Sequence, residues 1–84
     1  MQVQCPAGYT LKQGDLDDVT FLIKEYDEVE MAGCASHCNN NVKCKSFEWS
    51  DSKMNAKTCA LMSKSEPDHE KWGDIVFCKK GIKV

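Results

Sequence analysis

The most constraining feature of this 84-residue chain is its set of six cysteines: Cys5, Cys34, Cys38, Cys44, Cys59 and Cys78. A chain this short is near the lower limit at which a hydrophobic core alone stabilises a domain. The even count, the spread over the whole chain and the lack of a Cys-x-x-Cys pair favour disulfides over metal or redox chemistry. We therefore expect a small disulfide-rich domain from an oxidising, extracellular compartment, with no cofactor.

The length also bounds the domain organisation. Residues 1–84 are expected to form a single module whose core spans 5–80. Residues 1–9 carry no apolar stretch of the signal-peptide type, and no segment has the roughly 20 apolar residues that cross a membrane. We expect one module of a larger multidomain protein, with Met1 added for expression and no membrane insertion.

The charge pattern argues against nucleic acid as a partner. The formal net charge is -2, and all 11 basic residues are lysines. Arginine is the usual residue for two-point recognition of phosphate or sulfate groups. Its absence therefore disfavours nucleic acids and sulfated glycans. Acidic residues are concentrated in residues 1–30 and the remainder leans basic, which we interpret as two solvated faces.

Residues 28–39 are expected to form an amphipathic helix. Asp27 is a suitable N-cap, and Glu30 follows it at the capping-box spacing. One helix face, at spacing i, i+3, i+4 and i+7, carries Met31, Cys34, Ala35 and Cys38. Asparagine tolerates the left-handed conformation that closes helices, so the run Asn39–Asn41 should end this one. Two cysteines one turn apart can clamp such a helix to two different strands.

Hydrophobic and β-branched runs predict five strands, over residues 5–11, 19–23, 43–50, 57–62 and 72–80. In the third of these, alternation places Phe47 and Trp49 on one face and Cys44, Ser46 and Glu48 on the other. If Cys44 faces the helix, the two aromatic rings face away unless the register is reset, and the sequence leaves this open.

The turn at residues 14–18 contains three aspartates, Asp15, Asp17 and Asp18. Carboxylates of this kind can bind calcium, but the spacing of a dedicated calcium loop is missing. We therefore interpret the segment as an acidic turn.

The order of the cysteines and their neighbours forms a recognisable pattern. Cys34 and Cys38 share a helix and are followed by Cys44-Lys45-Ser46-Phe47-Glu48-Trp49 and by Cys59-Ala60-Leu61, with Cys5 and Cys78 near the ends. This pattern, over residues 5–80, resembles the PAN/apple domain family. The resemblance implies an α+β fold in which an antiparallel sheet of about five strands cradles one α-helix.

Six cysteines allow fifteen pairings, and sequence alone does not choose among them. The resemblance implies three pairs: Cys5–Cys78, Cys34–Cys59 and Cys38–Cys44. In the chain-entropy picture each of the longer closures stabilises by about 3–5 kcal/mol. That range is comparable with the whole stability of a small domain.

Two chemical alternatives were weighed against disulfides. Cys34, His37, Cys38 and Cys44 have the right side chains for zinc, but His37 lies off the cysteine face and no Cys-x2-Cys knuckle is present. Nucleophilic catalysis needs a free thiolate beside a base, which fully paired cysteines do not supply. We therefore expect neither a metal site nor an enzyme.

The candidate ligand-binding residues are Asp68, His69, Lys71 and Trp72. An aromatic ring flanked by charged groups suits stacking on a sugar or anchoring a protein partner. The competing interpretation, which we favour for Trp72, is that its ring covers the edge of the sheet.

The family resemblance implies a secreted or cell-surface module for adhesion or recognition. We expect protein–protein recognition, with a lectin-like domain for neutral, galactose-type sugars as the alternative. The partner is then a protein or carbohydrate on another molecule or cell surface.

Overall fold

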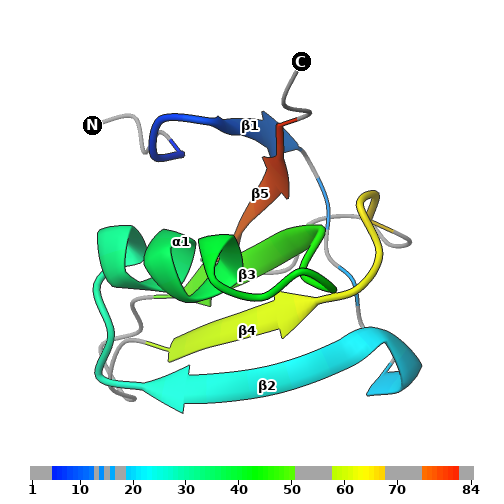
Figure 1. Ribbon diagram of the computed structural model, residues 1–84, viewed down its shortest axis with the longest axis horizontal. Coiled ribbons are helices and arrows are strands. Elements are labelled where there is room, and N and C mark those ends of the chain that lie inside the picture. Colours follow the sequence, from blue (N-terminus) through cyan, green and yellow to red (C-terminus); the bar gives the residue numbers. More distant parts are fainter. Residues whose placement is uncertain are drawn as a thin grey trace.

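The computed structural model describes residues 5–12, 14, 16, 19–50, 58–67 and 75–81. Within these residues one α-helix, α1 (Met31–Asn39), packs across one face of a five-stranded antiparallel sheet (Figure 1). The strands, in the order β1-β5-β3-β4-β2, are β1 (Tyr9–Lys12), β5 (Ile75–Lys80), β3 (Ser46–Ser50), β4 (Thr58–Met62) and β2 (Leu22–Asp27). The predicted α+β architecture is confirmed.

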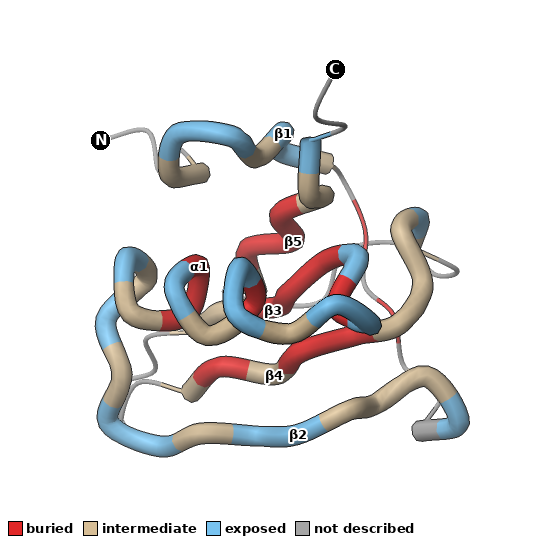
Figure 2. Tube along the Cα trace, in the orientation of Figure 1, coloured by how far each residue is buried: buried red, intermediate tan, exposed pale blue. Residues whose placement is uncertain are grey.

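The three central strands carry most of the core. Figure 2 shows burial concentrated in β3, β4 and β5, whereas the edge strands β1 and β2 consist of exposed and half-buried residues. The hydrophobic runs in the central strands are buried on both faces of the sheet.

The sheet has a core on each face. On the helix side, the buried face of α1 meets Phe47 of β3 and Leu61 of β4, both essentially without solvent exposure. On the opposite side a smaller cluster is formed by Leu16, Met62 and Phe77. Leu16, which lies between β1 and β2 in the chain, therefore packs on the face of the sheet that the helix leaves open.

The position of β3 shows how Cys44 and Phe47 can both face the helix, which the sequence left open. The strand begins at Ser46, so Cys44 precedes it and is not bound by its alternation. Cys44 and Phe47 both belong to the helix-side cluster. On the other face, the Glu48 carboxylate accepts a hydrogen bond from the backbone N–H of Leu16, at 3.4 Å.

The start of the helix differs from the prediction. Asp27 is not an N-cap, because β2 continues through it and pairs it with Thr58. The N-cap is Glu30, whose side chain makes no capping hydrogen bond. Between them Glu28 has a φ of 56°, which turns the chain from the strand into the helix. Tertiary pairing of β2 therefore outweighs the local capping signal.

The end of the helix also differs in detail. The asparagine run does end α1, but the C-cap Asn40 has φ -88° and ψ 4° rather than the left-handed conformation expected. The cap is instead satisfied by backbone bonds to the carbonyl oxygens of Ser36 and Cys38. The Cys38–Cys44 disulfide closes the following turn, so no left-handed residue is needed there.

The strand boundaries shift by several residues. The first strand is Tyr9–Lys12 rather than 5–11, and the last begins at Ile75 within the predicted 72–80. The apolar run at 19–23 forms a 3-10 turn, η1 (Val19–Phe21), before β2 begins at Leu22. The aspartates of the predicted acidic turn lie outside the described residues.

All six cysteines are paired, and none is free. The pairs are Cys5–Cys78, Cys34–Cys59 and Cys38–Cys44, with Cα–Cα distances of 5.7, 5.6 and 5.3 Å. These are the pairs that the family resemblance implies. They join the N-terminal segment to β5, the helix to β4, and the helix to the segment before β3.

Tyr9 adds a polar link between β1 and the helix. Its hydroxyl lies 3.1 Å from the carbonyl oxygen of Ala35 and 2.8 Å from Oδ1 of Asn39. Its ring packs edge-on against Phe47, with 4.9 Å between centroids. Burial raises the pKa of the Tyr9 hydroxyl above its ordinary value, so the group stays a protonated donor at neutral pH.

No helix in the described part of the chain is long and apolar enough to cross a membrane.

Candidate functional site

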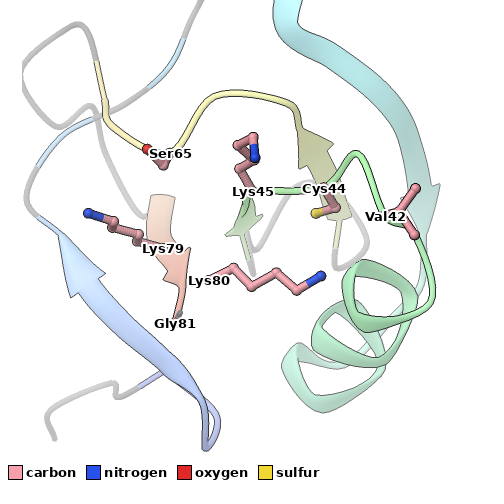
Figure 3. Close-up of a pocket in the computed structure, with 7 residues that line it drawn as sticks. All are labelled: Val42, Cys44, Lys45, Ser65, Lys79, Lys80 and Gly81. Carbon is pink, nitrogen blue, oxygen red and sulfur yellow. The ribbon is translucent and has the colours of Figure 1, made fainter. Parts of the chain in front are cut away.

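A pocket of about 390 Å³ opens at one end of the sheet, beside the end of the helix (Figure 3). Three chain segments form it: the turn after α1 with the residue before β3, the segment after β4, and the end of β5. We call it the lysine pocket, and its lining residues are Val42, Cys44, Lys45, Ser65, Lys79, Lys80 and Gly81.

The turn that carries Val42 is rigidly built. The N–H of Asn41 donates to the carbonyl oxygen of Cys38 at 3.1 Å, and the N–H of Cys44 donates to that of Asn41 at 3.0 Å. Oδ1 of Asn41 accepts from the N–H of Lys43 at 2.9 Å, an Asx-type turn. With the Cys38–Cys44 disulfide across its base, this turn holds Val42 in place.

Val42 is the most exposed large apolar residue that the structure describes, at 94%. A single exposed valine is ordinary on a protein surface. Val42 is unusual in combining full exposure with a turn that is tied down by a disulfide and by hydrogen bonds. Its side chain projects at the edge of the lysine pocket (Figure 3).

Lys80 is held against the end of the helix. Its ammonium group donates to the carbonyl oxygen of Cys38, in the last turn of α1, at 3.2 Å. A cation at this position interacts favourably with the negative end of the helix dipole. An ammonium group has three donor hydrogens, so this bond leaves Lys80 able to bind a further acceptor.

Lys79 is engaged at the outer side of the pocket. Its ammonium group lies 2.6 Å from Oε1 of Glu66, and that of Lys12 lies 3.7 Å from Oε2 of the same carboxylate. The hydrogen bond from Lys79, assisted by the positive charge of both lysines, lowers the pKa of the Glu66 carboxyl below its ordinary value. Glu66 is therefore ionised at neutral pH and partly neutralises this side of the pocket.

Lys45 differs from the other two lysines of the pocket. Its backbone is fixed, because its N–H donates to the carbonyl oxygen of Met62 and its own carbonyl oxygen accepts from the N–H of Lys80. Its side chain is exposed. Within the described residues, its ammonium group has no carboxylate partner and no hydrogen-bond acceptor.

The chemistry of the lysine pocket is that of an anion-binding surface. Three lysines line it, and ammonium groups only donate hydrogen bonds. Its one cysteine, Cys44, is in a disulfide and offers no nucleophile. In the described ranges, no three His, Cys, Asp or Glu residues lie close enough to hold a metal ion. The pocket is suited to binding.

The sequence suggested other residues for a ligand-binding site and for a zinc site. Asp68, His69, Lys71 and Trp72 lie outside the described residues, so their assignment stays a prediction. The three cysteines of the weighed zinc site are each in a disulfide. The histidine of that set, His37, stacks on Tyr26, with ring centroids 3.8 Å apart and planes at 9°.

Sequence reasoning missed the lysine pocket. Its members are residues 42, 44, 45, 65 and 79–81, which only the sheet topology brings together. The pairing of β3 with β5 sets Ser46 opposite Lys79, and this places the residues before β3 beside the end of β5. The sequence feature that could have indicated the pocket is the lysine content of residues 43–45 and 79–80. Solvated surfaces are also rich in lysine, so this feature alone does not identify a site.

The fold is that of a small disulfide-rich α+β module. The family model described as PAN domain matches residues 8–76, which is most of the chain. The chain therefore belongs to the PAN domain family, whose members are protein- or carbohydrate-binding modules in larger proteins. No curated protein and no solved structure matches the chain significantly.

Proposed function

We propose that the chain is an extracellular recognition module that binds a protein partner through the lysine pocket and the adjoining Val42. The observation that carries this proposal is the juxtaposition of a fully exposed, rigidly held Val42 with the unpaired cation of Lys45. A protein interface has an apolar centre and a polar, solvent-accessible rim, and Val42 and Lys45 could supply one contact of each kind. A preformed surface also loses little conformational entropy when it binds.

The extracellular location and the larger parent protein belong to the same proposal. Disulfides form and persist mainly in oxidising compartments, so three of them in 84 residues support this location. PAN domains are modules of larger proteins, which supports one module in a multidomain chain with its core over residues 5–80.

A protein partner is favoured over a neutral sugar by the lining of the pocket. Neutral sugars are recognised by stacking on aromatic rings and by mixed hydrogen-bond donors and acceptors. The described lining offers three lysines, a serine and a valine, and no aromatic ring.

The test is a binding screen with the folded, oxidised module. The purified secreted and cell-surface ectodomains and the glycan array are immobilised, and the labelled module is applied to both in solution. We expect at least one ectodomain to bind, and we expect Lys45→Glu and Val42→Asp to abolish that binding. Lys24→Glu, on β2, is the matched control and should leave it unchanged.

Two results would refute the proposal. One is an ectodomain that binds wild type and both pocket variants equally, because the contact would then lie elsewhere. The other is binding to neutral glycans alone, which would favour the lectin alternative. Unchanged far-ultraviolet circular dichroism of each variant ensures that a loss of binding is not a loss of fold.

A further inference from the structure

The chemistry of the lysine pocket also indicates what part of a partner it takes. We infer that the pocket binds a carboxylate-rich segment of a protein, with an apolar residue of that segment resting on Val42. This inference rests on the proposed function and specifies its ligand. Four features of the structure carry it: the availability of two cations, a carboxylate of the chain already bound at the pocket, the position of Val42, and the absence of arginine.

Lys45 and Lys80 supply the available cations. Lys45 has no partner among the described residues, so a carboxylate that binds it displaces no existing ion pair. Lys80 uses one donor hydrogen on the carbonyl oxygen of Cys38 and retains two. Because the backbones of these lysines are joined by a hydrogen bond of 2.9 Å, both side chains start from fixed positions.

Glu66 shows how a carboxylate sits against this surface. It accepts a hydrogen bond of 2.6 Å from Lys79 and lies 3.7 Å from Lys12, so two lysines already share one carboxylate. We expect a glutamate of an incoming segment to be held in the same way, by ammonium groups of Lys45 and Lys80. Glu66 would also compete with that segment for Lys79. Removing the charge of Glu66 should therefore strengthen binding, which a general loss of structure does not do.

Val42 adds an apolar contact beside the charges. It is 94% exposed, although its turn is fixed by a disulfide and by the hydrogen bond from the N–H of Lys43 to Asn41. An apolar residue between acidic residues of the ligand would lose water against this side chain while its neighbours reach the lysines. The pocket is thus matched to an acidic segment that includes one apolar residue.

A peptide carboxylate fits the pocket better than sulfate or phosphate does. The chain contains no arginine, so it lacks the planar fork that binds those groups at two points. Lysines act as single point charges, and a flexible acidic segment can adjust to them. A sulfated glycan offers no apolar group for Val42.

The test uses fluorescence anisotropy and ¹⁵N NMR titration on the oxidised chain at about 0.15 M ionic strength, where the Debye length is about 8 Å. The probe is the labelled, acetylated peptide Glu-Glu-Leu-Glu-Glu. Its comparison peptides are Gln-Gln-Leu-Gln-Gln and Glu-Glu-Ser-Glu-Glu, which separate the charged from the apolar contribution. A heparin hexasaccharide is the sulfated arm of the same experiment.

We expect Lys45→Ala to weaken binding of the acidic leucine peptide by about tenfold, as expected when a charge-assisted hydrogen bond is lost. Glu66→Gln should strengthen it by about threefold, because Lys79 and Lys12 are released from an exposed ion pair. Lys24→Ala removes the same charge from β2, outside the pocket. Because salt screens the attraction between separated surface charges, this change should alter the Kd of the peptide by no more than about twofold. The glutamine peptide should not bind, and the serine peptide should bind more weakly.

The inference is overturned if the acidic peptide fails to shift the amide signals of Val42 and Lys45 at millimolar concentration. It is also overturned if Lys24→Ala weakens binding as much as Lys45→Ala does, since the attraction would then be diffuse. Heparin binding that depends on Lys45, without peptide binding, assigns the pocket to sulfated glycans instead. An ectodomain that needs Lys45 but is not displaced by the peptide refutes the inference and leaves the proposed function standing.

Discussion

Replacing Glu28 with glycine should stabilise the domain. Glu28 is exposed and has a φ of 56°, the only positive φ of a residue other than glycine in the described ranges. The left-handed conformation costs such a residue about 1–2 kcal/mol, and glycine avoids that cost. The greater freedom of glycine in the unfolded chain offsets about 0.5–1 kcal/mol of the gain. The net expectation is a stabilisation of about 0.5–1 kcal/mol.

A series at this position separates backbone conformation from charge. Glu28→Gln removes the charge and keeps the strain, so its stability should match wild type. Glu28→Asn should lie between glutamine and glycine, because asparagine tolerates the left-handed region. Glu28→Val should destabilise the domain, since a β-branched residue is least tolerated there. As a control, Glu25→Gly in the middle of β2 should cost about 0.5–1 kcal/mol.

The assay is thermal unfolding of the oxidised variants, supported by urea titration at one temperature. For a domain of this size, 1 kcal/mol corresponds to a shift in Tm of about 4–8 °C. Glu28→Gly should therefore raise Tm by about 2–8 °C relative to Glu28→Gln. A glycine variant that is no more stable than the glutamine variant would refute the reasoning, because the turn would then not be strained.

Three further predictions concern the frame around the pocket. Replacing Cys38 and Cys44 together by alanine opens a loop of sequence separation 6, and should cost about 2 kcal/mol in urea unfolding; no loss would exclude that bridge. Gly81→Ala places a Cβ 2.6 Å from a backbone carbonyl oxygen, so Tm should fall, and an unchanged Tm would contradict this contact. Because Lys79 lowers the pKa of Glu66 in the folded state, the stability from this pair is complete above the unfolded pKa and is lost as pH falls through the folded pKa. Glu66→Gln should therefore flatten the acid side of the stability profile, and an unaltered profile would show that the pair contributes nothing.

The sequence predicts the architecture because the cysteine pattern and the hydrophobic runs report on the core. The face of Cys34, Ala35 and Cys38 is buried as its helical spacing indicates. The start of the helix could not be predicted in the same way. Asp27 is a good N-cap residue by type, but its backbone is used by β2 in pairing with Thr58. Local capping preferences are weak compared with a strand pairing that the sequence does not show.

The candidate site was harder to predict than the fold. Val42 and Lys45 follow the helix, whereas Lys79 and Lys80 lie more than thirty residues later in the chain. Only the placement of β5 beside β3 brings them together. A lysine on a strand end is most often a solvated residue, so composition alone does not distinguish Lys45 from Lys24. The difference lies in the neighbours of each ammonium group, which only the folded structure defines.

The most direct test of the account is a disulfide map of the protein under non-reducing conditions. Trypsin should leave two covalent assemblies, one joining residues 1–12 to 72–79 and one joining residues 25–43, 44–45 and 58–64. Fragmentation between Cys34 and Cys38 should then assign residues 58–64 to Cys34 and residues 44–45 to Cys38. A free thiol, or a link between residues 1–12 and 25–43, would contradict the frame on which the lysine pocket depends.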